Sequence, residues 1–440
     1  MTSAMIVNFF HTAMWHTVTN HWTPEVSHVS SRSIRTASSH RKNLPPGPTP
    51  IPFLGNVFDI KADAPWVSYA TMQKTYGDTI YTRALNMKII VLNSEEVADE
   101  LLEKRSRVYS DRPYIVTSDL FGWEWATPIA RYGERFRIHR RLYHQVFRSE
   151  AALTYCRRQL QKAYEMLTLI LHDPAHYGGH FEVFVASVVL SVTYDYDIAS
   201  HDDVVLNAAK RAKKAALFGA FPLLKKLPSW IPGLGLKDAN LSRQYVKDML
   251  DFPYNHANGS AQASMVSDAL ERYHISEDTD NPEMVTEIKA SAATAYAGGC
   301  SQYPVTTAAS LLTFTLAMMN NPKVQERAQA EIDKVVGLDR LPNFDDLPAL
   351  PYNPFTPLAV PHSNTEDDFY RGYFIPKGAQ LSAAKPLFGT LNDDTVPCVF
   401  GFGRRRHPGR HVGDASLWSA IACILGHFHD QETYRAKTNS

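Results

Sequence analysis

The sequence predicts a mainly α fold with a small β portion. Apolar residues recur three and four positions apart along residues 322–336 and 412–425, which is typical of amphipathic helices. In contrast, residues 79–93 hold two β-branched, apolar runs around a short polar break, which indicates a hairpin. The sequence contains neither an internal repeat nor a glycine-rich phosphate loop, so many helices and few strands are expected.

The composition excludes several classes of protein. The chain has 440 residues, with 45 Lys and Arg against 45 Asp and Glu, so its formal net charge is zero. This balance argues against a protein that binds nucleic acid by broad neutralisation of phosphates. With 44% hydrophobic residues, the chain can bury a large core. The four cysteines form no CxxC pair, which disfavours a disulfide scaffold and favours a reducing compartment.

The first 43 residues differ from the rest of the chain. Residues 1–24 contain no Lys, Arg, Asp or Glu, but polar residues interrupt their apolar run, and a spanning helix needs about 20 mostly apolar residues. A short or degraded membrane anchor, an interfacial segment, a flexible leader and a wrongly assigned start all stay open. Residues 25–43 are rich in Ser, His and Arg, as in a linker. We therefore expect one domain over residues 44–430 and a tail at 431–440.

The helices of the expected domain follow the hairpin. One begins at Asn321-Pro322, where Asn can cap the helix and Pro suits the first helical position, and it ends at Gly337. Its apolar residues recur at spacings of four, four and three. The other clear helices are expected over residues 204–217, roughly 282–319, and 412–425.

Residues 400–410, Phe-Gly-Phe-Gly-Arg-Arg-Arg-His-Pro-Gly-Arg, carry the most specific motif in the chain. The segment resembles the haem-binding loop of the cytochrome P450 monooxygenases, F-x-x-G-x-R-x-C-x-G, and matches it at Phe400, Gly403, Arg405 and Gly409. Glycine permits tight turns against a flat macrocycle, and arginine can pair with a haem propionate. The resemblance therefore implies that these four residues bind haem (iron protoporphyrin IX).

Other segments resemble the same family, in the same order, along residues 44–429. Residues 44–50 resemble its proline-rich hinge, and residues 297–299 resemble the start of its oxygen-binding motif. Residues 136–140 resemble the W-x-x-x-R of its C helix, which makes Arg140 a second propionate partner. Two further segments look like fungal members of the O-methylsterigmatocystin oxidoreductase type, namely residues 111–113 and 365–377.

The resemblance has consequences for activity, partners and location. It implies a P450-like fold that oxidises an apolar small molecule, of secondary-metabolite or xenobiotic type, with electrons from an NADPH-linked reductase. The fungal microsomal type implies the cytosolic face of the endoplasmic reticulum membrane, and no nucleic acid as a partner. Thr306 and Thr307 match the threonines of the family's oxygen-activating helix, so they are the expected catalytic residues.

The position of the iron ligand holds His407, where the family has cysteine. An anionic thiolate donates electron density that favours cleavage of the O–O bond, whereas an imidazole gives a globin-like or peroxidase-like iron. Two interpretations stay open: His407 ligates the iron, or it is a surface or cavity residue left after loss of the ligand. Cys398 lies upstream of the Phe400–Gly403 turn and is a poor substitute.

The long helix contains a second departure from the family. Residues 300–303 form a four-residue insertion, which advances the threonines by about 400°, slightly more than one helical turn. Pro304 removes a backbone hydrogen bond and should kink or break the helix. Thr306 and Thr307 are then either displaced proton-delivery residues or ordinary helix-packing residues.

A third departure follows residue 350. The E-x-x-R of the family's K helix is absent after residues 350–352, and the meander and C-terminal strands are shortened, so we expect an incomplete P450-like fold. Three functions stay open. They are a haem monooxygenase by descent, a non-catalytic remnant or mis-spliced product unable to hold haem, and a His-ligated haem protein with a peroxidase-like or binding role.

Overall fold

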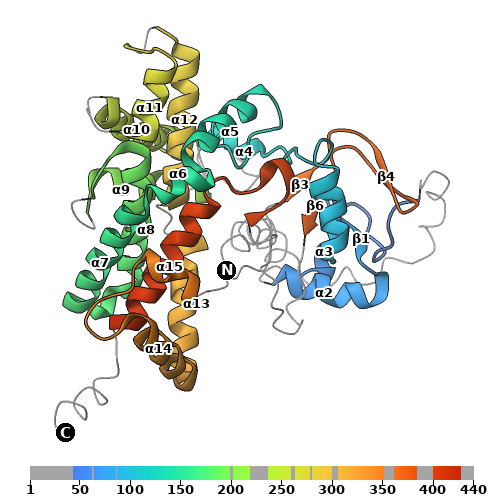
Figure 1. Cartoon of the computed structure of the whole chain (residues 1–440). Coiled ribbons are helices and arrows are strands. Elements are labelled where there is room, and N and C mark those ends of the chain that lie inside the picture. Colours follow the sequence, from blue (N-terminus) through green and yellow to red (C-terminus); the bar gives the residue numbers. More distant parts are fainter. Residues whose placement is uncertain are drawn as a thin grey trace.

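Helices form the larger part of the molecule, and a smaller part built on strands lies beside them (Figure 1). This arrangement confirms the predicted mainly α fold with a small β portion. The computed structural model describes residues 43–61, 64–85, 87–198, 202–218, 236–258, 263–277, 280–299, 306–350, 361–383 and 400–427.

The helices run in order along the chain, with a few short turns of helix between them. The α-helices are α2 (Pro65–Tyr76), α3 (Glu95–Ala98), α4 (Val116–Phe121), α5 (Glu134–Phe147), α6 (Ser149–Leu153), α7 (Cys156–His172), α8 (Tyr177–Tyr194), α9 (Val204–Phe218), α10 (Leu236–Asn258), α11 (Met265–Arg272), α12 (Pro282–Gly299), α13 (Thr306–Asn320), α14 (Pro322–Val336) and α15 (Arg410–His427). The short turns are η3 (Val57–Asp59), η4 (Asp99–Lys104), η5 (Pro174–His176), η7 (Phe344–Ala349) and η9 (Gly403–Arg405).

The strands form a four-stranded sheet and a separate hairpin. The predicted hairpin over 79–93 is confirmed, because β1 (Thr79–Ala84) pairs antiparallel with β2 (Met87–Leu92). The sheet order is β1-β2-β6-β3, with β6 (Gln380–Ala383) parallel to β2 and β3 (His362–Ser363) antiparallel to β6. The second hairpin consists of β4 (Asp368–Tyr370) and β5 (Tyr373–Ile375).

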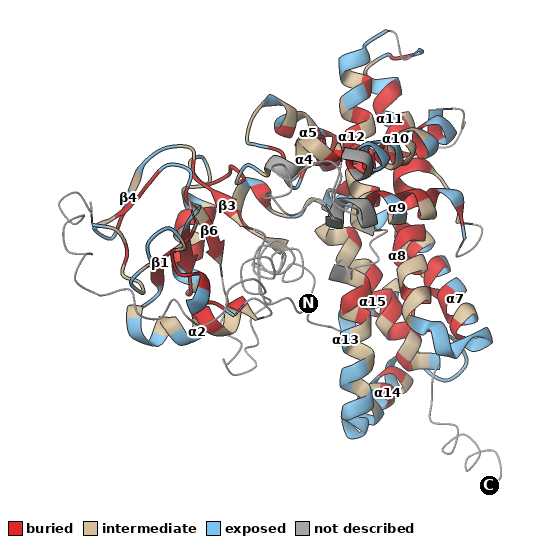
Figure 2. Ribbon diagram, turned by 180° about the vertical axis from the view of Figure 1, so that it is seen from behind, coloured by how far each residue is buried: buried red, intermediate tan, exposed pale blue. Residues whose placement is uncertain are grey.

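The helical core is built around α8. Its side chains are apolar and buried on nearly every face, as expected of a helix covered on all sides. Helices α7, α12 and α13 pack against it, and α15 packs against α7 and α13. Figure 2 shows this buried interior along α8 and α15. The helix that follows the 400–410 segment is therefore anchored in the main core.

The predicted helices agree with the structure where it describes them. Helix α14 begins at Pro322 and ends at Val336, and Gly337, with a φ of 83°, terminates it. The helices predicted over 204–217 and 412–425 are α9 and α15. The helix predicted over 282–319 corresponds to α12 and α13, while the intervening Pro304 lies outside the described residues.

Several expectations concern parts of the chain that the structure does not describe. The leader at residues 1–42, the K-helix region at 351–360, the meander at 384–399 and the C-terminal residues 428–440 all lie outside the described residues. Among the described helices, none combines the length and the apolar character that a membrane span requires. The shortening of the family's segments thus stays a prediction.

Gly55 joins the proline-rich segment to the sheet. Its backbone pairs with Ala84 at the end of β1, and its φ is 75°. A Cβ at this position would lie 2.1 Å from the main-chain oxygen of Arg83. The close approach therefore requires glycine, both for its backbone conformation and for its lack of a side chain.

We predict that Gly55→Ala destabilises the protein more than Gly372→Ala. Both glycines have a positive φ, which costs an alanine about 1–3 kcal/mol, but the added Cβ meets nothing within 4 Å at Gly372. The clash at Gly55 should add about 1–3 kcal/mol to the loss in free energy of unfolding, measured in urea. Equal losses for the two variants would contradict the close packing against β1.

Candidate functional site

The 400–410 segment, hereafter the loop, packs directly against η4. The Gly403 N–H donates to Glu103 Oε2 at 2.5 Å, and Arg406 Nη2 donates to the same oxygen at 3.1 Å. A Cβ on Gly403 would lie 2.4 Å from the Leu102 main-chain oxygen, and the φ of Gly403 is 54°. Gly403 is thus required for contact between the loop and η4.

Arg405 is the most deeply held cation of the loop. Its guanidinium donates to the main-chain oxygens of Ser110 at 2.8 Å, Thr127 at 3.2 Å and Ala130 at 2.6 Å. Its central carbon lies 3.7 Å from the centroid of the Phe136 ring, a cation–π contact. Burial, together with other nearby arginines, lowers the pKa of Arg405 to about 8. The loop is therefore fixed to the segment that precedes α5.

Arg140 connects the same loop to α5. Its Nη1 donates to the Arg406 main-chain oxygen at 2.7 Å, so Arg140 lies against the loop that contains Arg405, the other position that the resemblance assigns to a propionate. Burial lowers the pKa of Arg140, and the nearby Arg410 adds to this effect. The structure thus brings Arg140 close to the loop that contains Arg405, while the haem-binding role of both residues stays a prediction.

His407 follows these arginines. Its main-chain N–H donates to the Phe400 oxygen at 2.6 Å, and the two rings lie 6.4 Å apart between centroids. A Cβ on Gly409 would lie 3.2 Å from His407 Cε1, so Gly409 leaves little spare space for the imidazole. The His407 side chain is exposed to solvent, yet the protein atoms around it, followed by the charges of Arg140 and Arg410, lower the pKa of His407 to about 4. The imidazole is therefore neutral near pH 7, the form that ligates metals.

Two residues that the sequence analysis did not assign complete this cluster. Buried Arg112 donates through Nε to the Pro128 oxygen at 3.0 Å and through Nη1 to the Pro361 oxygen. Buried His362 contacts the Tyr109 oxygen through Nδ1 at 2.8 Å, and burial followed by the charge of Arg112 holds its pKa well below the usual value. Arg112 lies within residues 111–113, which resemble the family, but His362 precedes the other such segment at residues 365–377, and nothing in the sequence indicated that the two residues meet.

Positive charge exceeds negative charge around the loop. The charges of Arg112 and Arg140 disfavour the charged form of Arg405, and the charge of Arg410 disfavours that of Arg140. Arg140 and Arg410 likewise disfavour the charged form of His407. The nearby carboxylate of Asp111 is already bound by Arg131 Nη2 at 2.9 Å and by the Tyr132 N–H. An anionic group with two carboxylates, such as haem, fits this excess of charge.

The predicted catalytic threonines lie on α13 and not on the loop. Thr306 and Thr307 begin α13, which packs against α8 and α15. The Thr306 side chain and residues 300–305 lie outside the described part of the chain, and Thr307 is partly buried. The predicted roles of both threonines stay predictions.

Comparison with known proteins places these features in one family. The sequence profile of the family described as Cytochrome P450 matches residues 45–396, a region that ends just before the loop. The chain is 32% identical to cytochrome P450 monooxygenase 98 of Postia placenta, over 88% of this chain and 84% of that protein. It is 32% identical to cytochrome P450 monooxygenase COX2 of Coprinopsis cinerea, over 93% of this chain and 87% of that protein. It is 34% identical to the cytochrome P450 protein eriC of Hericium erinaceus, over 90% of this chain and 86% of that protein.

These alignments also bear on the missing segments. The alignment with the Postia placenta protein is 443 positions long but covers 88% of the 440 residues of this chain. The relative therefore carries residues that this chain lacks between the aligned ends. This difference agrees with the expected shortening of some segments, without locating them.

We predict that Gly403→Ala loosens the loop. Alanine at this position must push η4 away, whereas Gly378→Ala meets nothing within 4 Å at a similar positive φ. Gly403→Ala should lower the free energy of unfolding by about 1–3 kcal/mol more than Gly378→Ala. Hydrogen exchange at residues 400–410 should also accelerate in Gly403→Ala alone, and equal exchange in both variants would contradict this packing.

Proposed function

This chain belongs to the cytochrome P450 family, and on that premise we propose that it is a haem-dependent monooxygenase by descent that oxidises an apolar small molecule. The observation that carries the proposal is the convergence of Arg140, Arg405 and His407 at one loop, where positive charge exceeds the negative charge of Glu103 and Asp111. Members of this family bind haem, and the residues of the loop fit such a group.

Each residue would have a distinct part in holding haem. Arg140 offers N–H donors and positive potential to the propionates, and Arg112, which lies near Arg405, adds to that potential. Gly403 keeps the loop close to η4, Gly409 leaves space for the His407 ring, and His407 would present a neutral imidazole to the iron. When bound, haem supplies the redox-active iron that oxidation by this family requires.

The exchange of cysteine for His407 should alter reactivity. A thiolate favours O–O bond cleavage by donating electron density, and a neutral imidazole donates less. We infer that His407 shifts the protein towards the peroxidase-like or binding behaviour of His-ligated haem proteins. Substrate oxidation would then be weaker than in a thiolate-ligated relative.

One observation favours a second candidate, a non-catalytic remnant that holds no haem. All three guanidinium nitrogens of Arg405 already donate to main-chain oxygens. A propionate would therefore have to share these donors or displace a carbonyl. In this alternative, Arg405 serves only to fasten the loop.

A basic depression on the α5 side of the loop supports an electron-donating partner. It measures about 470 Å³ and includes Arg137, Arg141 and Arg404, with Glu134 as its acidic residue. An acidic protein surface would complement it, because opposite potentials steer protein association. We propose that an NADPH-linked reductase docks there.

An apolar patch at the tip of the β1–β2 hairpin supports membrane association. Phe53 is 87% exposed and lies in a turn at the hairpin tip, where the Leu85 N–H donates to the Leu54 oxygen. Phe58, which follows in η3, is 56% exposed. The exposed Lys88 beside Met87 adds positive charge. Apolar tips with a basic rim fit the interface of anionic bilayers, so we propose attachment to the cytosolic face of the endoplasmic reticulum.

The optical spectrum of the reduced, CO-treated protein tests the haem proposal. We expect an imidazole-type Soret band in the wild type and a thiolate-type band in His407→Cys. The control Cys398→Ser should leave the wild-type band unchanged. A thiolate-type band in the wild type would contradict ligation by His407, and the absence of haem absorbance would support the remnant instead.

We predict that Phe53→Ser combined with Phe58→Ser weakens binding to vesicles that contain anionic phospholipid. Each substitution removes a large apolar side chain from the interface, and full burial of such a side chain contributes about 1.5–3 kcal/mol. Sedimentation of the full chain with vesicles measures the bound fraction. The control Leu153→Ser changes an exposed apolar residue on α6, and it should bind as the wild type does. A double variant that binds like this control would contradict the proposed surface.

A further inference from the structure

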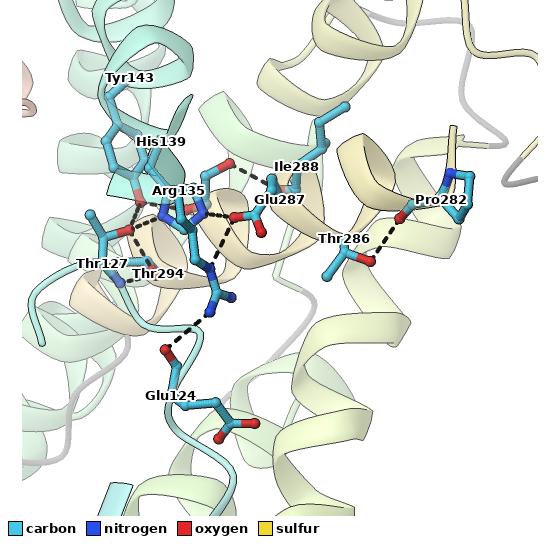
Figure 3. A network of polar contacts seen from close by, with 11 residues as sticks. Glu124, Thr127, Arg135, His139, Tyr143, Pro282, Thr286, Glu287, Ile288 and Thr294 are labelled. Atoms are coloured by element: carbon cyan, nitrogen blue, oxygen red, sulfur yellow. Dashed lines mark hydrogen bonds and ion pairs between the residues drawn. The ribbon is translucent and has the colours of Figure 1, made fainter. Parts of the chain in front are cut away.

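A buried polar network joins α5, α12 and the segment that precedes α5 (Figure 3). Thr127 lies at its centre. Its Oγ1 lies 2.7 Å from His139 Nδ1 and 2.9 Å from the Tyr143 hydroxyl. Both partners project from α5, and all three side chains are buried. One hydroxyl on a non-helical segment thus connects to two successive turns of α5.

The network continues from α5 to α12 through a carboxylate. His139 Nε2 contacts Glu287 Oε2 at 2.6 Å, and Arg135 Nε donates to the same oxygen at 3.1 Å. Burial raises the pKa of Glu287, but the hydrogen bonds and charges of His139 and Arg135 outweigh this effect and hold it below its usual value. The ionised carboxylate therefore acts as the acceptor that fixes His139.

The main chain of Thr127 extends the network in two further directions. Its N–H donates to Thr294 Oγ1 of α12 at 3.2 Å. Its carbonyl oxygen accepts from Arg405 Nη1 at 3.2 Å. The same residue thus contacts α5 through its side chain, α12 through its N–H and the loop through its carbonyl.

We propose that Thr127 and His139 are positioning residues for the loop. The His139 imidazole, held by Glu287, fixes the Thr127 hydroxyl, and this orients the peptide group that receives Arg405. Helix α5 is fixed at the same time, and the adjacent Arg140 holds the Arg406 carbonyl. The inference rests on the proposed function only in naming haem as the group for which the arginines are positioned.

A hydroxyl is the essential feature at residue 127. Thr127→Val keeps the shape of the side chain but leaves His139 Nδ1 and the Tyr143 hydroxyl without this partner in a buried site. Thr127→Ser restores the hydroxyl and removes only a methyl group. If the network positions the loop, the loop should be as well ordered in Thr127→Ser as in the wild type, and less ordered in Thr127→Val.

Trypsin can measure the order of the loop without haem, because the loop contains Arg404, Arg405 and Arg406 in sequence. Cleavage there is normalised to cleavage after Arg327, an exposed residue of α14 in the same molecule. We expect at least a fivefold rise in this ratio for Thr127→Val, and less than a twofold rise for Thr127→Ser. General unfolding would raise both cleavage rates, so a purely structural role leaves the ratio unchanged.

Thr193→Val provides a matched control. Thr193 is a buried residue of α8 whose hydroxyl donates to the Val189 oxygen of its own helix. This variant should keep the wild-type ratio. A wild-type ratio in Thr127→Val, or an equal rise in Thr193→Val, would overturn the proposal. Should Thr127→Val fail to fold, Tyr143→Phe removes one hydroxyl partner of Thr127, and an unchanged ratio in that variant would also overturn it.

Haem binding separates this inference from the proposed function. Where the wild type binds haem, Thr127→Val should weaken the affinity at least tenfold and Thr127→Ser less than threefold. Where the wild type binds none, the proposed function fails, and the cleavage ratio still decides whether Thr127 and His139 position the loop.

Discussion

Burial of the Arg405 guanidinium is the constraint on which the rest of the site depends. A charged group can leave water only if its N–H donors find acceptors, and here three main-chain oxygens and the face of Phe136 supply them. Because these acceptors belong to the segment between residues 110 and 130, the loop is held between the strand-built part and α5. Its neighbour His407 is thereby placed beside Arg140 and Arg410.

These charges also determine the state of the imidazole. The charges of Arg140 and Arg410 disfavour a further positive charge on the solvent-exposed imidazole, so His407 is neutral and retains a lone pair. The loop therefore combines a neutral imidazole with positive potential suited to carboxylates. The same positive charges would stabilise the anionic thiolate of a cysteine at this position.

Local patterns predicted the elements but not the contacts between them. The hairpin at 79–93 and helix α14 were predictable because turn residues, capping residues and apolar spacing act within a few residues. The acceptors of Arg405 are main-chain oxygens almost 300 residues away in sequence, and no side-chain pattern marks them. Likewise, nothing in the sequence connects His139 to Glu287, which lies 148 residues further along the chain. The loop motif identified the site, and only the fold could supply its partners.

The central claim is that this loop cradles iron porphyrin through an imidazole. A crystal structure of the haem-reconstituted protein, with anomalous data collected at the iron edge, tests it most directly. The account predicts one iron peak at ligand distance from a His407 ring nitrogen, with the propionates facing Arg140. A peak bonded to a different side chain, or reconstituted crystals without an iron peak, would contradict it.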